Sequence, residues 1–320
     1  MRWCSPARPV RGTYTDRVSA SAAARVSAVV VHYRTPRESV EAAHAVVRAA
    51  PGVEVVVVDN ASRDSIAEDL AREVPTARLL VEDANRGYGA ACNRGARETE
   101  RPLLLFLNSD ALVQPGAVEA LVAALDADPR AAAVGPRLEN PDGTLQPSIQ
   151  RLPSLRTIFC ESAGLAALAG GRFPFRGHSA TREDHSRTQA VESLKGAALL
   201  VRRAAFEHAG GFDEGFFLYG EETDLMARWR RLGWKVLFEP SARVVHTGGA
   251  SGGDALFGRL HEGLALHVAR HQGRTAATLA RAVLRAGAAT RYVLSLVTPG
   301  ERGRARRARY RAALAGTRRA

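Results

Sequence analysis

The sequence predicts an α/β protein with a mostly parallel central sheet and a basic helical segment at its C-terminal end. Residues 26–31 and 53–58 are short runs rich in valine, as expected of strands buried on both faces of a parallel sheet. Segments with helical patterns alternate with these runs, and this alternation is typical of βαβ units. The composition is that of a globular protein, with 46% hydrophobic and 24% charged residues among 320.

The remaining elements follow in the same alternation. A helix over 36–50 joins the first two strands, and Pro36 suits its first turn. Further strands are predicted at 79–81, 103–107, 131–135, 196–201, 234–238 and 242–246, and further helices at 88–97, 115–125 and 221–232. Residues 137–192 are irregular and rich in Pro and Gly, which predicts a loop-rich insertion beside a ligand site.

Three segments are expected along the chain. Residues 1–25 form a basic tail, residues 26–252 the α/β domain with halves at 26–137 and 138–252, and residues 253–320 a helical, Arg-rich extension. Within 274–297, the residues Arg274, Arg281 and Arg285 share one helical face, and Leu279, Val283, Leu294 and Val297 lie roughly opposite. Such a helix lies in a membrane interface or packs on the α/β domain.

The net charge of +12 resides at the two ends of the chain. The first 25 residues carry +4 and the last 20 carry +7, which leaves +1 on the rest. Basic ends suit nucleic acid, an anionic membrane surface or plain solvation. The sequence has no apolar run long enough to span a bilayer and no pattern of a secretory signal, and its three cysteines form no CxxC pair. We therefore expect a cytoplasmic protein.

Two carboxylates come at the ends of predicted strands. Asp59 follows the strand at 53–58, and Asp110 follows the strand at 103–107 within Asn108-Ser109-Asp110. Open α/β sheets bind ligands at the carboxyl ends of their strands, so both could face one crevice. Each also suits turn or helix-cap chemistry, and the pattern alone leaves both interpretations open.

A glycine-containing segment, 85–93, stands just before the helix at 88–97. Gly87 and Gly89 allow a tight backbone, and the following helix N-terminus offers N–H donors to a phosphate. A dinucleotide fingerprint is disfavoured, because Cys92 takes the place of its third glycine and the segment follows the third strand.

Three carboxylates, Glu221, Glu222 and Asp224, fall in the first turn of a predicted helix. The helix dipole favours acidic residues there, while the apolar residues at 216–219 would raise a carboxyl pKa and favour a general base. His246 ends a strand before a Gly-rich loop. His267 and His271 have the spacing of a metal pair, but exposure to solvent is the expectation for them.

The ordered set of these segments resembles a known family. The motifs are Val29-Val-Val-His-Tyr33, Val57-Val-Asp59-Asn-Ala-Ser62, Asn85-x-Gly87-Tyr-Gly-x-x-x-Asn93, Leu107-Asn-Ser-Asp110, Gly196-Ala197, Tyr219-x-Glu221-Glu222-x-Asp224-Leu225 and His246-x-x-Gly. In these motifs the chain resembles the inverting family-2 glycosyltransferases with the GT-A fold. Within that family the chain is most similar to the bacterial rhamnosyltransferase-like branch, which builds cell-wall and O-antigen polysaccharides. The resemblance covers residues 26–251.

The resemblance implies roles for individual residues. Glu222 would be the catalytic base, with Glu221 and Asp224 as alternatives, and Asp110 and His246 would hold Mg²⁺ or Mn²⁺ on the donor diphosphate. Gly196, Ala197 and Trp229 would face the acceptor. The nucleotide-sugar would contact Tyr33, Asp59, Asn85, Gly87, Tyr88, Asn93, Asn108 and Asp110. Two positions depart from the family pattern, since Asn108 replaces the first acid of the DxD motif and Glu222 replaces an aspartate.

The resemblance also implies the substrates. dTDP-rhamnose is the first expectation for the donor, followed by UDP-linked galactofuranose, glucose or N-acetylglucosamine. The acceptor would be a saccharide, free or linked to polyprenyl diphosphate. The basic extension would hold the enzyme at the inner face of the cytoplasmic membrane.

Two rival functions fit the residues less well. A sugar nucleotidyltransferase would carry a Gly- and Lys-containing loop after its first strand, where residues 32–36 have neither residue. A nucleic-acid-binding protein would carry basic and aromatic residues on its body, which is nearly neutral here, so no specific nucleic acid partner is expected.

Overall fold

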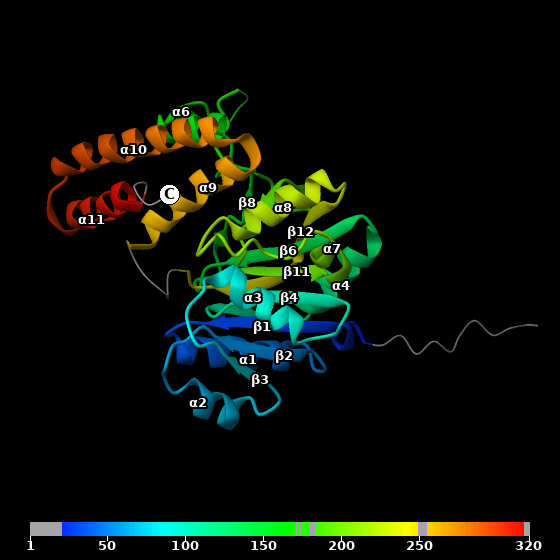
Figure 1. The fold of residues 1–320 in the computed structure, drawn as a ribbon. Helices are drawn as coiled ribbons and strands as arrows, with labels where there is room; N and C mark the ends of the chain where they lie inside the picture. Colours follow the sequence, from blue (N-terminus) through cyan, green and yellow to red (C-terminus); the bar gives the residue numbers. More distant parts are fainter. Residues whose placement is uncertain (1–20, 171, 173, 180–182, 249–254, 317–320) are drawn as a thin grey trace, which may run out of the picture.

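The computed structural model describes residues 21–170, 172, 174–179, 183–248 and 255–316. Its centre is a mixed sheet that runs through the molecule (Figure 1). The strand order is β3-β2-β1-β4-β11-β6-β12-β5, with β7 added to β6 and β9 to β12. These strands are β1 Val26–His32, β2 Glu54–Asp59, β3 Arg78–Val81, β4 Leu103–Asn108, β5 Ala111–Val113, β6 Ala131–Glu139, β7 Leu145–Gln146, β9 Gln189–Val191, β11 Ala198–Arg202 and β12 Lys235–His246. A separate pair joins β8 Ile149–Gln150 to β10 Ser193–Leu194.

The half that begins the chain is parallel, as the sequence predicts. Strand β1 pairs in parallel with β2 on one side and with β4 on the other. The chain therefore reverses its direction of progress across the sheet between β1 and β4, and a crevice forms outside the carboxyl ends of two such strands. The residues at these ends are His32 and Tyr33 after β1, and Asn108 to Asp110 after β4.

Both faces of this sheet are covered. Val30 of β1 and Val57 of β2 pack into a core with helices α1 (Pro36–Ala49), α2 (Ile66–Glu73) and α4 (Ala117–Ala127). Val29 and Val56 point the other way, into a second core with α3 (Tyr88–Arg97), α7 (Arg203–His208) and α8 (Glu221–Arg231). Alternate residues of one strand thus enter different cores, which explains why the runs are apolar without interruption. A short 3₁₀ turn, η1 (Ala22–Arg25), precedes β1.

The second half departs from the prediction in three ways. The segments at 234–238 and 242–246 form one long strand, β12, with an irregularity between Glu239 and Arg243 where Pro240 interrupts the ladder. Strand β11 is antiparallel to both of its neighbours. The segment predicted to be loop-rich contains α5 (Leu155–Ser162) and α6 (Leu165–Leu168) as well as short strands.

Three helices form a layer at one end of the sheet (Figure 1). They are α9 (Ala255–Gln272), α10 (Arg274–Leu296) and α11 (Gly300–Gly316). Ile158 of α5 packs with Leu264 of α9 and with Ala277, Ala280 and Leu284 of α10 in a third core. None of the described helices is both long and apolar enough to cross a membrane.

The buried face of α10 differs from the predicted apolar face. Alanines at 277, 280 and 288 and Leu284 are buried, whereas Leu279, Leu294 and Val297 stay exposed. Small residues face the neighbouring helices because they permit close backbone approach, so Gly287 lies where a Cβ would be 3.0 Å from the Ser162 side chain of α5. Of the residues predicted to form the apolar face, Leu279, Leu294 and Val297 are thus left on the outside.

Candidate active site

A carboxylate and an imidazole meet where β4 and β12 end. His246 pairs with Ala111 in the β12–β5 ladder, and this register brings the ring beside the preceding residue, Asp110. Asp110 Oδ1 lies 3.3 Å from His246 Nε2, and the Asn108 side-chain amide lies 3.4 Å from the same nitrogen. The structure therefore brings together three residues that the sequence singled out, although His246 is 136 positions from Asp110.

The charge state of this pair follows from its partners. Burial favours the neutral form of Asp110, but the adjacent His246 and the N–H of Gly248 outweigh it and hold the pKa of the carboxyl below its ordinary value. His246 Nδ1 lies 2.7 Å from Oε1 of Gln146, an oxygen that can only accept a hydrogen bond. The neutral imidazole thus carries its hydrogen on Nδ1 and presents the Nε2 lone pair to Asp110.

This donor set fits a divalent cation in a limited way. With His246 neutral, two electron-rich atoms face each other at 3.3 Å, and a proton or a metal ion between them would relieve the repulsion. The described residues contain no group of three or more His, Cys, Asp or Glu that could hold a metal. A cation bound here would therefore need further oxygen ligands from a bound molecule such as a diphosphate.

The start of α8 supplies the candidate bases. Tyr219 and Gly220 both have left-handed φ angles, 68° and 104°, and this turn aims the first residues of α8 into the interior. Glu222 is half-buried and accepts a hydrogen bond from the Gly220 N–H at 3.3 Å. Burial raises the pKa of Glu222, and hydrogen bonds from backbone N–H groups, including that of Gly196, limit the rise.

Glu221 differs from its neighbour. It is 3% exposed, and its Oε2 has no hydrogen-bond partner among the described residues. Burial, together with the charge of Glu222, raises the pKa of Glu221 well above its ordinary value. Of the two, Glu222 is the carboxylate whose charged form is stabilised by backbone N–H donors.

Asp224 is engaged elsewhere. One carboxylate oxygen accepts from Arg228 Nε and the other pairs with His271 Nε2 of α9, both at 2.8 Å. Burial opposes its ionisation, but His271 and Arg228 prevail and lower its pKa. Asp224 therefore ties α8 to α9, which argues against its role as a base. The expectation that His267 and His271 face solvent is wrong, because His267 is 1% exposed and His271 pairs with Asp224.

Two further predicted site residues lie in the interior. Trp229 is fully buried, and its indole N–H donates to the Ala205 carbonyl at 2.9 Å, so it cannot face an acceptor. Asn93 is also buried and clamps the backbone of Phe212, whose N–H it accepts and whose carbonyl it bonds, each at 2.9 Å. These contacts give Asn93 a structural role in place of the predicted contact with a nucleotide.

The segment at 85–93 is built against the loop that precedes α8. Gly87 has a φ of 97°, and a Cβ on it would lie 2.2 Å from the Phe217 carbonyl oxygen. The next N–H, of Tyr88, donates to that same oxygen at 3.0 Å. Asn85 accepts from the Gly87 N–H and from the side chain of Asn60, each at 2.9 Å. These bonds fix the loop after β3 to the loop after β2.

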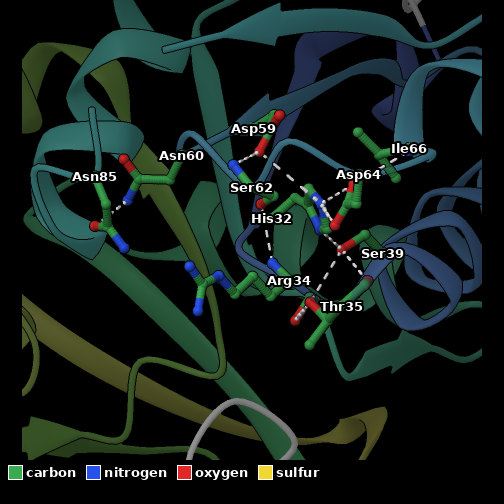
Figure 2. Close-up of polar contacts among 11 residues, drawn as sticks. His32, Arg34, Thr35, Ser39, Asp59, Asn60, Ser62, Asp64, Ile66 and Asn85 are labelled. Atoms are coloured by element: carbon green, nitrogen blue, oxygen red, sulfur yellow. Dashed lines mark hydrogen bonds and ion pairs between the residues drawn. The ribbon is translucent and has the colours of Figure 1, made fainter. Parts of the chain in front are cut away.

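A polar network lies beneath the carboxyl ends of β1 and β2 (Figure 2). His32, fully buried, bonds Ser39 through Nδ1 at 2.8 Å and Asp64 through Nε2 at 3.1 Å. Asp59 accepts from the Ser62 N–H at 2.8 Å and lies 3.9 Å from His32. The structure thus bears out the turn role of Asp59, and its contact with a base or ribose stays a prediction.

Backbone strain concentrates at the same edge of the sheet. Four non-glycine residues of the described chain have positive φ angles: Arg34, Ala61, Arg63 and Tyr219. The first three follow β1 and β2, and the fourth adjoins the candidate bases. Such conformations cost about 1–3 kcal/mol each and gather at functional sites. Tyr33 is half-buried here, with the Arg34 guanidinium 5.1 Å from its ring centre.

A cavity of about 540 Å³ joins these parts. Asn108 and His246 line one side, and Tyr88, Gly196, Ala197, Glu221 and Glu222 line its centre. Helix α9 forms the facing wall. A Cβ on Gly196 would lie 3.3 Å from Glu222 Cγ, so this glycine leaves the base accessible. Glu221, Glu222 and His246, the partner of Asp110, therefore line one cavity.

Several residues of the site escaped the sequence analysis. His32 and Asn60 stood inside the quoted motifs, and their position at strand ends was a usable signal. Gln146 and Lys195 lie in the segment from β7 to β11 and reach the site through tertiary contacts, so nothing in the local pattern marks them.

Fold and site together define an α/β protein that gathers acidic side chains at the carboxyl ends of its strands. The sequence model of glycosyl transferase family 2 matches residues 27–209, more than half of the chain. The chain belongs to this family, and the GT-A resemblance and fold class predicted above are confirmed.

The chain is also similar to individual glycosyltransferases and polysaccharide-synthesis proteins. An N-acetylglucosaminyl-diphospho-decaprenol L-rhamnosyltransferase of Mycobacterium tuberculosis is 36% identical over 209 residues, which cover 61% of this chain and 66% of that protein, just under two thirds of its length. An O-antigen biosynthesis protein of Myxococcus xanthus is 31% identical over 63% of this chain and 15% of its own. A mannosyltransferase of Pyrobaculum calidifontis, solved with GDP-Man and Mn²⁺, shares the fold with a TM-score of 0.57 at 19% identity, over 92% of this chain and 86% of its own.

Proposed function

We propose that this protein transfers L-rhamnose from dTDP-rhamnose to a saccharide carried on polyprenyl diphosphate, in the synthesis of a cell-wall or surface polysaccharide. The activity of the mycobacterial relative supports the sugar and the lipid-linked acceptor. The observation that carries the proposal is the shared cavity, which is lined by the half-buried Glu222 and by His246, the partner of Asp110.

Glu222 acts as the general base. It lines the cavity and faces Gly196, which leaves room for an acceptor hydroxyl. Its carboxylate takes the proton as that hydroxyl attacks the anomeric carbon, and a single displacement inverts the centre. Enclosure excludes water, and orientation of the hydroxyl favours transfer over hydrolysis of the donor. Gly196 and Ala197 form the acceptor side of the reaction centre.

The donor lies along the edge formed by the ends of β1, β2 and β4. Tyr33 and Asp59 contact the nucleoside, and the loop of Asn85, Gly87 and Tyr88 borders it. Asp110 and His246 hold Mg²⁺ or Mn²⁺, which supplies positive charge to the leaving diphosphate when bound. Asn108 stands in place of the first acid of the family's DxD motif. It contributes a neutral amide, so the site has one negative charge fewer.

The C-terminal helices bring the enzyme to the inner face of the cytoplasmic membrane. Leu294 and Val297 at the end of α10 are 63% and 83% exposed, and Val293 and Leu296 beside them are also exposed. The following helix, α11, is rich in arginine. An apolar patch next to basic residues suits an interface with anionic lipids. We keep the division into a tail at 1–25, a catalytic domain at 26–252 and an extension at 253–320 as part of the proposal; residues 1–20 lie outside the described ones.

A donor panel tests this function. Thermal shifts of the purified protein are measured with dTDP, UDP and GDP, with and without Mn²⁺, for the wild type and for Asp110→Ala. The proposal predicts a shift with dTDP that needs the metal and is lost in Asp110→Ala. A shift confined to UDP or GDP would reject rhamnose as the sugar, and the absence of any shift would reject the donor site.

A further inference from the structure

We infer that Lys195 and the apolar face of α9 form the binding site for the diphosphate and the first isoprene units of the lipid-linked acceptor. This inference rests on the proposed function, which supplies the class of acceptor but not its site. It concerns the wall of the cavity that lies outside the Asp110–His246 pair and the candidate bases. That wall combines one lysine with the α9 residues Leu256, Phe257, Leu260 and Leu264.

Lys195 has an unusual position for its residue type. The chain contains 43 Arg and only two Lys. The other lysine, Lys235, forms an ion pair with Asp128 at 2.7 Å. Lys195 is half-buried, lines the cavity, and forms no ion pair with an acidic side chain of the described chain. Burial lowers the pKa of its ammonium group because no acidic side chain offsets the desolvation, and an anion in the cavity would supply that missing partner.

Lys195 lines the same cavity as the candidate base and lies next to it in the chain through Gly196, which faces that base. Lys195 directly precedes Gly196, the residue whose Cβ position lies 3.3 Å from Glu222 Cγ. Its own N–H donates to the Ser148 carbonyl at 2.9 Å, which fixes the backbone at this point. A saccharide with its hydroxyl at Glu222 and its diphosphate one sugar ring away would place the phosphates beside this lysine.

The facing wall has the chemistry of a lipid site. Leucines of α9 line the cavity next to Phe257, whose ring carries the Arg309 guanidinium of α11 at 5.5 Å from its centre. A free saccharide would leave this apolar surface in contact with water or with sugar hydroxyls, at a cost in free energy. An isoprenoid chain covers it, while the diphosphate meets Lys195. One amphipathic ligand therefore satisfies both halves of the wall.

The close packing of α9 on the catalytic loop makes this wall part of the reaction centre. A Cβ on Gly263 of α9 would lie 2.0 Å from the carbonyl oxygen of Tyr219, two residues before Glu221. His271, further along α9, pairs with Asp224 of α8. The helix is thus held on both sides of the candidate bases, and a lipid chain against it stays in register with the acceptor hydroxyl.

The test measures binding and kinetics on the full chain with Lys195→Met and, as a matched control, Lys235→Met. Binding of geranyl diphosphate is followed by calorimetry, with inorganic diphosphate and geraniol as separate probes. We expect Lys195→Met to weaken geranyl diphosphate by about tenfold or more, because a charged hydrogen bond is lost. Lys235→Met binds like the wild type, and Leu256→Gln weakens geranyl diphosphate but not inorganic diphosphate.

Kinetics separate the acceptor from the donor. Lys195→Met is expected to raise KM for a prenyl-diphosphate-linked acceptor about tenfold and to leave the Kd of dTDP unchanged. Equal binding of geranyl diphosphate by both proteins, or a weakened dTDP with an unchanged acceptor KM, would overturn the inference. Lys195-dependent binding of geranyl diphosphate without transfer from any nucleotide-sugar would support the site while the proposed function fails.

Discussion

Hydrogen-bond partners distinguish the three carboxylates at the start of α8. Asp224 is held by Arg228 and His271, Glu221 is buried with an unpartnered oxygen, and Glu222 lines the cavity with backbone N–H donors. Sequence spacing cannot separate them, because all three fall within one helical turn. Their different environments leave Glu222 as the group that is accessible from the cavity and hydrogen-bonded by backbone N–H donors.

The pH dependence of transfer follows from this assignment. A base acts only when ionised, and burial raises the pKa of Glu222, so kcat/KM should fall with acid below an apparent pKa above the ordinary value of about 4.3. The measurement is kcat/KM from pH 4.5 to 9, with protein stability followed at each pH. Glu221→Gln should retain this acidic limb. Loss of the limb in Glu221→Gln would assign the base to Glu221.

Gln146 should set the affinity of the metal site. Its side-chain oxygen fixes the hydrogen of His246 on Nδ1, so Gln146→Leu would free the ring and weaken Mn²⁺ by about 10- to 100-fold. Activity at saturating Mn²⁺ should recover most of its wild-type level. Gln114→Leu, which loses only a local bond to Leu112, serves as control. An unchanged metal requirement in Gln146→Leu would remove His246 from the proposed ligands.

At the scale of elements, the sequence predicts regular structure well and tertiary partners poorly. The helix over 88–97 agrees with α3 to the residue, and the strands β1 to β4 lie within one residue of their predicted bounds. The long β12 was divided because Pro240 resembles a strand end. The exposed face of α10 was misjudged because alanines make the helix contacts, and hydropathy alone ranks leucine as the better core residue.

The sequence predicted the proximity of Asp110 and His246, and the structure places them 3.3 Å apart. They follow strands whose ends meet at one edge of the sheet, so a family motif and a topological rule sufficed for this placement, while their role as metal ligands stays a prediction. Trp229 and Asn93 were misplaced because apolar and amide side chains give the same local signal on a core face and in a cleft. Asp224 was left open because its partner, His271, is 47 residues away on a helix whose docking the pattern does not reveal.

Packing of α9 against the catalytic loop gives a test at the element scale. Gly263→Ala would force a Cβ against the Tyr219 carbonyl, so we expect about 1–3 kcal/mol lower free energy of unfolding and a reduced kcat. Gly143→Ala has a positive φ of 79° with open space around it, and should lose about 1 kcal/mol with full activity. Chemical denaturation and steady-state rates measure both. Wild-type kcat in Gly263→Ala would show that α9 can move without consequence.

The whole molecule places its catalytic edge beside the helical layer. Helices α9 to α11 lie together at one end of the sheet (Figure 1). Residues of α9 and α11 line the cavity, and α10 carries exposed apolar residues. A protein with a nearly neutral catalytic domain and basic C-terminal helices would be attracted to an anionic surface through those helices, and its catalytic domain would stay free of the surface. This arrangement would bring the lipid-bearing end of an acceptor to the same side as the proposed lipid site.

Vesicle binding tests this orientation. The double variant Leu294→Glu with Val297→Glu should lose most co-sedimentation with phosphatidylglycerol vesicles, because it adds charge to the apolar patch. Binding of the wild type should weaken as salt is raised. Leu232→Glu changes an exposed leucine on the catalytic body, 44% exposed, and should bind like the wild type. Equal sedimentation of all three proteins would reject the C-terminal helices as the membrane contact.

The transfer reaction itself tests the central claim most directly. Labelled dTDP-rhamnose is incubated with N-acetylglucosaminyl-diphospho-prenol, Mn²⁺ and either the wild type or Glu222→Gln, and the product's anomeric configuration is read by NMR. The account predicts a rhamnosylated lipid of inverted configuration from the wild type. It predicts a rate at least about 10²-fold lower from Glu222→Gln, with unchanged dTDP binding. Retained configuration, or a Glu222→Gln enzyme as fast as the wild type, would contradict it.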